Sequence, residues 1–116
     1  MATKILLIIS DSDEDRSNII DAFNHHNLLT AGDRPSAITQ ISGNPDINLI
    51  ILDLCSPDIE GFKILNEIKS DAHHKNLPVI ILTNPEEPEA EISGLRAGAV
   101  DYIRKPLHME SLKARA

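Results

Sequence analysis

Short apolar runs alternate with polar, helix-like segments along the whole chain. Runs of four to eight β-prone apolar residues between turn signals are typical of strands buried on both faces of a parallel sheet. The predicted strands are 4–9, 28–31, 48–52, 78–82 and 101–103. The third of them holds the uninterrupted run Leu-Ile-Ile-Leu and ends at Asp53, so we place it at the centre of the fold.

The segments between these runs carry apolar residues at helical spacing. Ser12 or Asp13 can cap the first helix, and the acids that follow suit the positive end of its dipole. The second helix has Pro35 near its start and Gly43 near its end, which is the usual asymmetry of helix termini. The remaining predicted helices are 59–70, with Phe62, Ile64, Leu65 and Ile68 on its inner side, 89–97, ended by Gly98, and 109–116.

This alternation predicts an α/β protein with a doubly wound parallel sheet of five strands and five helices on its two faces. Right-handed crossovers favour the flavodoxin-like strand order 2-1-3-4-5. A length of 116 residues suits one domain. Because the last helix is short, we expect residues 1–116 to be one domain of a longer natural chain.

The composition narrows the classes of function. A formal net charge of −7 disfavours direct binding to nucleic acid or to an anionic membrane, because both need clustered basic side chains. No apolar run approaches the ~20 residues that span a bilayer. Cys55 is the only cysteine, which excludes an intrachain disulfide and fits a reducing compartment. We therefore predict a cytoplasmic protein.

Carboxylates cluster at 11–15 and at 86–91. A run of charges is usually a solvated face, and we interpret 86–91 in this way. The cluster 11–15 directly follows the first strand, at the sheet edge where open α/β proteins bind ligands. At that edge Asp11 would meet Asp53, Thr83 and Lys105, which end or follow the other strands.

Such a set of residues favours one kind of chemistry. Carboxylates at one edge repel each other unless a divalent cation lies between them, and their oxygen ligands suit Mg²⁺. A carboxylate is also a competent nucleophile towards phosphorus, and it then forms an aspartyl phosphate. A metal, an ammonium group and a hydroxyl can stabilise the phosphoryl oxygens. The pattern predicts phosphoryl transfer to a carboxylate.

Several motifs together are highly specific. They are the acidic residue after the first strand, Pro57 and Gly61 after Asp53, Leu-Pro-Val-Ile-Ile-Leu-Thr ending at Thr83, Gly-Leu-Arg-Ala-Gly-Ala-Val-Asp-Tyr, and Lys105-Pro106. With them the chain resembles, over essentially its whole length, the receiver domains of two-component response regulators.

The resemblance implies that Asp53 accepts a phosphoryl group from a histidine kinase or a phosphotransfer protein. It implies that Mg²⁺ is bound by Asp11, Asp53 and the backbone carbonyl of Cys55, and that Lys105 pairs with the phosphoryl group. The domain would then catalyse its own phosphorylation and dephosphorylation without being a turnover enzyme in the usual sense.

The resemblance also implies a switch. Thr83 would move towards the phosphoryl group and hydrogen-bond it, and Tyr102 would turn inward as Thr83 moves. The change would reach the surface made by the fourth helix, the fifth strand and the fifth helix. That surface would bind a partner, form a homodimer or control a C-terminal output domain that this chain lacks.

Two residues depart from the family pattern. Receivers usually have two acids after the first strand, and here the first is Ser10, which should weaken Mg²⁺ binding without abolishing it. Asp13 could partly compensate. Asn84 follows Thr83 where a small residue is usual, so it could hinder small phosphodonors, and Asn84→Ala would then be phosphorylated faster by acetyl phosphate. The peptide bond before Pro106 is expected to be cis, which would aim Lys105.

Two other readings stay open. Ser10 is compatible with a degenerate receiver that acts by contact alone, as a phosphorylation-independent interaction module. Asp11-Ser12-Asp13 after an apolar strand is also similar to the nucleophile motif of haloacid-dehalogenase-like phosphatases. Against this alternative, the chain lacks the threonine or valine expected two residues after Asp13, a cap domain, and room for a later acidic motif.

Overall fold

A five-stranded parallel sheet forms the centre of the molecule, in a computed structural model that describes residues 4–55 and 60–115. The strand order β2-β1-β3-β4-β5 confirms the prediction from the sequence. The strands are β1 (Ile5–Ile9), β2 (Asn27–Ala31), β3 (Leu49–Asp53), β4 (Val79–Thr83) and β5 (Asp101–Arg104). Each strand end is within one residue of its predicted position, and Asp53 and Thr83 are the last residues of β3 and β4 rather than the first beyond them.

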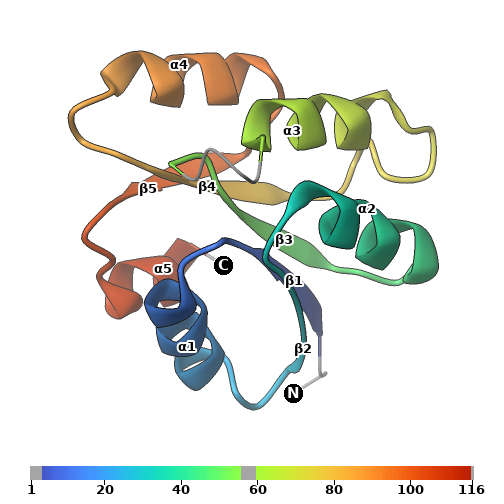
Figure 1. Ribbon diagram of the computed structural model, residues 1–116, viewed down its shortest axis with the longest axis horizontal. Coiled ribbons are helices and arrows are strands. Elements are labelled where there is room, and N and C mark those ends of the chain that lie inside the picture. The colour runs from blue at the N-terminus through green and yellow to red at the C-terminus, as the bar shows by residue number, and fades with distance from the viewer. Residues whose placement is uncertain (1–3, 56–59, 116) are drawn as a thin grey trace.

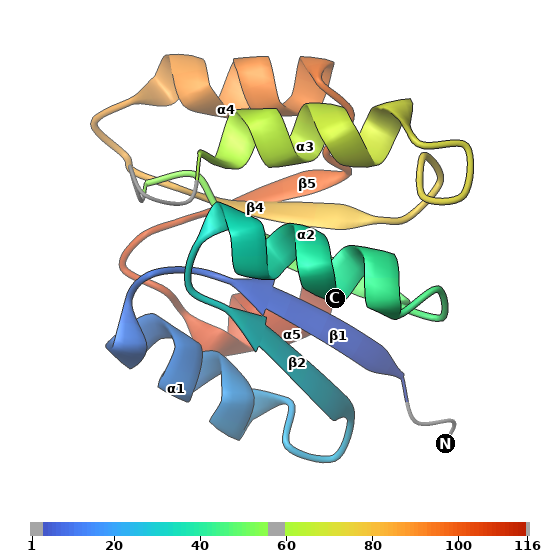
Figure 2. The ribbon, with the colours of Figure 1, turned by 45° about the vertical axis from the view of Figure 1, so that its right-hand side comes forward.

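The helices form one layer on each side of this sheet (Figures 1 and 2). Their bounds are α1 (Asp13–Ala22), α2 (Arg34–Gly43), α3 (Gly61–Ser70), α4 (Pro88–Arg96) and α5 (Met109–Arg115). Helices α1 and α5 cover one face, and α2, α3 and α4 cover the other. Within the described residues no helix is long and apolar enough to cross a membrane.

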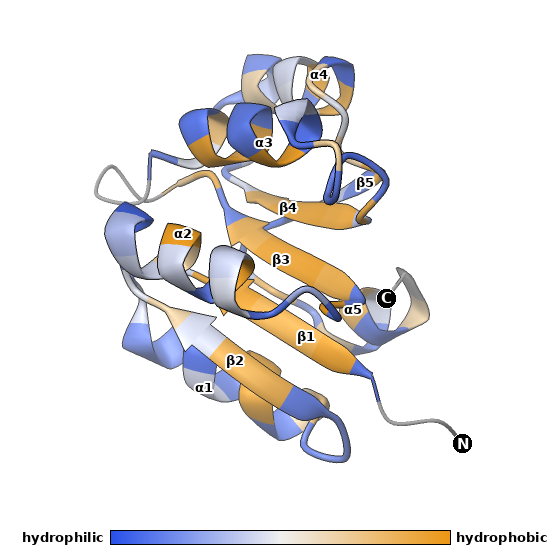
Figure 3. Ribbon diagram, turned by 90° about the vertical axis from the view of Figure 1, so that its right-hand side faces the viewer, coloured by the Kyte–Doolittle hydropathy of each residue, from blue (hydrophilic) through white to orange (hydrophobic). Residues whose placement is uncertain are grey.

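The core is mainly aliphatic and is divided into two clusters by the sheet. Every residue of β3 and β4 is buried, and Figure 3 shows both strands as hydrophobic along most of their length. Ile19, Phe23 and Leu112 pack on one face, and Ile64 and Leu65 pack on the other. Each buried Leu or Ile stabilises the fold by about 2 kcal/mol relative to exposure. The central strands are thereby held rigidly, with their carboxyl ends at one edge.

Local signals position the segments at that edge. The Ser12 hydroxyl caps α1 and accepts the Asp15 N–H at 3.1 Å. Gly61 starts α3 close to the end of β3, where a Cβ atom would lie 2.5 Å from Leu54 Cδ2 and 3.3 Å from the Asp53 carbonyl oxygen. A Cβ atom here would displace the end of the Leu54 side chain and crowd the Asp53 carbonyl, so a glycine favours the start of α3 this near to β3.

Two predictions about side chains are wrong. Phe62 is 37% exposed, because the inner face of α3 is set by Gly61, Ile64, Leu65 and Ile68, and Phe62 falls at its margin. Glu91 is only 5% exposed, although we interpreted 86–91 as a solvated face. It shares the inner face of α4 with Gly94, three residues further on. Pro57 and Ile59 lie outside the described residues.

Candidate functional site

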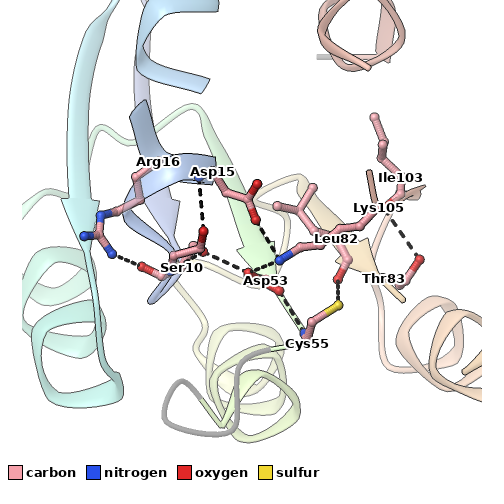
Figure 4. A network of polar contacts seen from close by, with 10 residues as sticks. Ser10, Asp15, Arg16, Asp53, Cys55, Leu82, Thr83, Ile103 and Lys105 are labelled. Atoms are coloured by element: carbon pink, nitrogen blue, oxygen red, sulfur yellow. Dashed lines mark hydrogen bonds and ion pairs between the residues drawn. The ribbon is translucent and has the colours of Figure 1, made fainter. Parts of the chain in front are cut away.

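Polar side chains gather at the carboxyl edge of the sheet, where four neighbouring strands end. Ser10 follows β1, Asp53 ends β3, Thr83 ends β4 and Lys105 follows β5. The parallel register pairs Ile9 with Leu52, and this aligns the ends of β1 and β3. The structure thus brings Ser10, Asp53 and Lys105 into direct contact, as Figure 4 shows.

Asp53 is completely buried and is surrounded by hydrogen-bond donors. Its Oδ1 accepts the Cys55 N–H at 2.8 Å. Its Oδ2 accepts the Ser10 hydroxyl at 2.8 Å and the Lys105 ammonium at 2.8 Å. Burying a carboxylate is costly unless the carboxylate is paired and hydrogen-bonded. Asp53 meets both conditions, so its carboxylate is held in place at the edge of the sheet.

The Ser10 hydroxyl has a fixed direction. Its oxygen accepts the Ser12 N–H at 3.1 Å, and its hydrogen is donated to Asp53. Ser10 is fully buried, so its hydrogen bond to Asp53 is shielded from water. Where the family has an acid, this chain therefore has a donor that stabilises the Asp53 carboxylate without any metal.

Lys105 bridges two carboxylates. Its Nζ lies 2.8 Å from Asp53 Oδ2 and 2.8 Å from Asp15 Oδ2. Burial acts to lower the pKa of Lys105, but the hydrogen bonds to Asp15 and Asp53 outweigh burial and raise the pKa above its ordinary value. Lys105 is therefore a cation throughout the neutral range, as the predicted pairing with a phosphoryl group requires.

Asp15 is the acid of the 11–15 cluster that reaches this site, and the sequence reasoning missed it. We named Asp13 as a compensating acid, but Asp13 is exposed and forms an ion pair with Arg16. The Asp15 side chain is 20% exposed and faces Lys105 from the first turn of α1 (Figure 4). The Ser12 cap was the signal in the sequence that could have identified Asp15, because a cap at Ser12 fixes the direction of that first turn.

Asp11 is exposed and lies directly after Ser10 on the loop between β1 and α1. Together with Asp53 it supplies hard oxygen donors, and Mg²⁺ is commonly bound by only one or two carboxylates while it keeps several waters. The donor chemistry therefore fits Mg²⁺. Among the residues described, no three acidic, histidine or cysteine side chains form a group that could hold a metal.

Thr83 is fully buried, and its hydroxyl is engaged by α4. Its Oγ1 donates to Glu91 Oε2 at 3.0 Å and lies 3.5 Å from the Ile103 carbonyl oxygen. Glu91 in turn accepts two hydrogen bonds from the Arg104 guanidinium, at 2.7 and 3.0 Å. The hydrogen bond from Arg104 holds the pKa of Glu91 below its ordinary value.

The other predicted residues surround these groups. Tyr102 is half-buried, and the Arg104 guanidinium lies 5.6 Å from the centre of its ring. Burial and the nearby Asp53 charge raise the pKa of the Cys55 thiol to about 11. Asn84 turns back on its own loop, where its side-chain oxygen accepts the Glu86 N–H at 3.0 Å. The peptide bond before Pro106 is cis, as expected.

The same kind of domain is found in other proteins. A family model described as Response regulator receiver domain matches residues 6–116. The chain belongs to this family. The receiver is 32% identical to the "Two-component response regulator ORR12" of Oryza sativa, an alignment that covers 97% of this chain and 94% of the relative. It is 28% identical to the "Chemotaxis protein CheY1" of Helicobacter pylori over 93% of this chain and 90% of the relative.

Solved structures and longer relatives extend the comparison. A receiver domain protein from Clostridium thermocellum superposes with a TM-score of 0.86 at 28% identity, over 96% of this chain and 89% of that one. The receiver is also 32% identical, over 95% of its length, to a "Probable cyclic di-GMP phosphodiesterase" of Vibrio cholerae. It spans only 25% of the length of that relative. Receivers similar to this one therefore occur both as nearly whole proteins and as parts of longer ones.

Proposed function

We propose that this receiver accepts a phosphoryl group on Asp53 from the phosphohistidine of a histidine kinase or a phosphotransfer protein, in a reaction that requires Mg²⁺. The observation that carries the proposal is the buried Asp53 carboxylate, hydrogen-bonded by Ser10, Cys55 and Lys105 at the edge of the sheet. Family membership supports it, because receivers act in two-component systems.

In the proposed reaction a carboxylate oxygen of Asp53 attacks phosphorus, a new O–P bond forms, and the P–N bond to the donor histidine breaks. The electron pair of the broken bond returns to the imidazole. Lys105 then pairs with the phosphoryl oxygens instead of the carboxylate. Hydrolysis reverses the modification, since attack by water on phosphorus releases phosphate and regenerates Asp53.

The residues that would hold Mg²⁺ are Asp11, Asp53 and the backbone carbonyl of Cys55. The metal would neutralise charge on the phosphoryl oxygens. Ser10 supplies no negative charge, so a weaker affinity for Mg²⁺ follows for this receiver than for relatives with an acid there. Lys105, held by Asp15, supplies a permanent positive charge at the same place.

Phosphorylation would shift an equilibrium between two conformations of the α4, β5 and α5 surface, with Thr83 and Tyr102 as the residues that move. A shallow pocket on this surface is lined by residues of β5, including Tyr102 and Arg104, by His108 just before α5 and by Ser111 of α5. The surface would contact an output domain, a separate partner or a second copy of this chain. The cytoplasmic location stays a prediction.

The test is the intact mass of the protein after incubation with acetyl phosphate, with Mg²⁺ or with a chelator. We expect the mass of one phosphoryl group to be gained only with Mg²⁺, and to be lost in Asp53→Asn. Asp21→Asn, which removes an exposed carboxylate on α1, is the matched control and should behave as the wild type. No gain with Mg²⁺, and none with a cognate kinase, would refute the proposal and favour a receiver that acts by contact alone.

A further inference from the structure

Glu91 is a buried carboxylate that no part of the proposed reaction uses. It belongs to a run of acids whose other members, Glu86, Glu87 and Glu89, are exposed. Only 5% of Glu91 is exposed, and it accepts three hydrogen bonds, one from Thr83 and two from Arg104. A carboxylate buried in this way is retained only where its partners offset the loss of hydration.

The contact with Thr83 limits what Thr83 can do. A hydroxyl has one hydrogen to donate, and an ionised carboxylate can only accept. At 3.0 Å from Glu91 Oε2, the Thr83 hydroxyl has committed that hydrogen to Glu91. It cannot at the same time donate to an oxygen of a phosphoryl group on Asp53.

Arg104 fixes the position of the Glu91 carboxylate. Its guanidinium binds both oxygens of Glu91, a geometry that restrains direction as well as distance. Arg104 is the last residue of β5, directly opposite Thr83 in the sheet register, and it lies over the ring of Tyr102. The contacts therefore run from Thr83 through Glu91 and Arg104 to Tyr102, across α4 and β5.

We propose that Glu91 is a positioning residue that holds Thr83 in its unphosphorylated conformation, so that a phosphoryl group on Asp53 must compete with Glu91 for the Thr83 hydroxyl. The inference rests on the proposed function, and it adds a residue that sets the balance between the two conformations. Weakening Glu91 as an acceptor should favour the phosphorylated conformation. Glu91 acts only through Thr83, so its effect must vanish when the hydroxyl is removed.

The experiment measures the affinity of the protein for beryllofluoride, a mimic of the phosphoryl group, in the presence of Mg²⁺. Glu91→Gln keeps the size of the side chain but replaces a charge-assisted hydrogen bond with a neutral one, and we expect about fivefold tighter binding. Glu91→Met, which cannot accept a strong hydrogen bond, should bind tighter still. Glu89→Gln removes an exposed charge from the same turn of α4 and should bind as the wild type does.

The double variant Thr83→Val/Glu91→Gln isolates the route of the effect. We expect it to bind beryllofluoride no more tightly than Thr83→Val alone. A gain that persists without the hydroxyl would overturn the proposal, because Glu91 would then act on the site in another way. Equal affinities of the wild type, Glu91→Gln and Glu91→Met would overturn it as well.

A second measurement separates this inference from the proposed function. In the protein without beryllofluoride, the methyl resonance of ¹³C-labelled Thr83 should shift in Glu91→Gln and stay in place in Glu89→Gln. A shifted resonance in a protein that never binds beryllofluoride refutes the proposed function while the Glu91–Thr83 contact stands. An unshifted resonance in a protein that binds beryllofluoride refutes the inference alone.

Discussion

Asp53 and Glu91 are both buried carboxylates at the same edge of the sheet, but they are neutralised by different cations. Asp53 ends a rigid central strand and faces Lys105, whose ammonium is shared with Asp15. Glu91 lies on a helix at the surface of the molecule and faces the planar fork of Arg104. Lysine is a compact point charge, whereas arginine binds a carboxylate through two parallel hydrogen bonds.

The two cations also differ in their exposure to solvent. The Lys105 side chain is 25% exposed, while that of Arg104 is 57% exposed. Water can therefore replace Arg104 as a partner more easily than it can replace Lys105. The Asp53 cluster would suit the proposed phosphoryl transfer, which needs fixed charges, and the Glu91 cluster would suit a contact that opens if Thr83 changes partner as proposed.

The largest expected effect, on the free energy of unfolding, comes from removing the cation that pairs with each buried carboxylate. Lys105→Met leaves Asp53 buried without its counter-charge, and we expect it to lower the free energy of unfolding by about 2 kcal/mol. This is less than the loss for a fully buried pair, because water reaches part of Lys105. Arg104→Met should cost clearly less. Urea unfolding in the presence of a chelator measures both.

Asp53→Asn provides the matched check on this comparison. Added to Lys105→Met, it removes the unpaired charge and should recover most of the lost stability. Added to Arg104→Met, it should recover little, since Arg104 binds Glu91 whereas Asp53 binds Lys105. A larger loss in Arg104→Met than in Lys105→Met would show that we have ranked the two clusters wrongly.

A smaller effect is expected from restoring an acid beside Asp53. Ser10→Asp replaces a donor by an anion, so without metal the two carboxylates repel and the melting temperature should fall. Mg²⁺ should reverse the loss, and its affinity should rise by about tenfold, because ligand charge governs such sites. Ser10→Asn, neutral and of similar size, is the control. If Mg²⁺ stabilises both variants equally, position 10 does not determine metal binding.

The fold could be predicted from the sequence because the pattern that indicates each strand is local and is repeated along the chain. Each strand is a short apolar run, and together the runs predicted both the sheet order and the edge to which Asp53 is directed. Asp53 and Lys105 could be found because a residue at the end of a strand has little choice of position. Strand order predicts that they share one edge, but β4 lies between their strands, so their direct contact also needs the long side chain of Lys105.

The surroundings of side chains on helices were harder to predict from the sequence, because they depend on how each helix packs on the sheet. Asp15 and Asp13 lie in the same turn of α1, yet only Asp15 reaches Lys105, far along the chain. Glu91 sits in a run of acids, and its partner Arg104 belongs to the next strand. A buried acid within a run of charges cannot be recognised from the sequence, since composition does not distinguish it from the exposed acids beside it.

The smallest expected effect is on the single thiol beside Asp53, which reports on the charge of that carboxylate. With a pKa of about 11, mostly from burial and then from Asp53, the Cys55 thiol should react slowly with iodoacetamide at pH 8. Asp53→Asn removes the nearby negative charge, lowers the pKa of Cys55 and should speed alkylation by about twofold. Glu91→Gln changes the other buried carboxylate and should leave the rate unchanged, which makes it the control. Equal rates in the wild type and Asp53→Asn would mean that the Asp53 charge does not set the pKa of Cys55, and that the thiol does not sense the carboxylate to which we assign the proposed phosphoryl transfer.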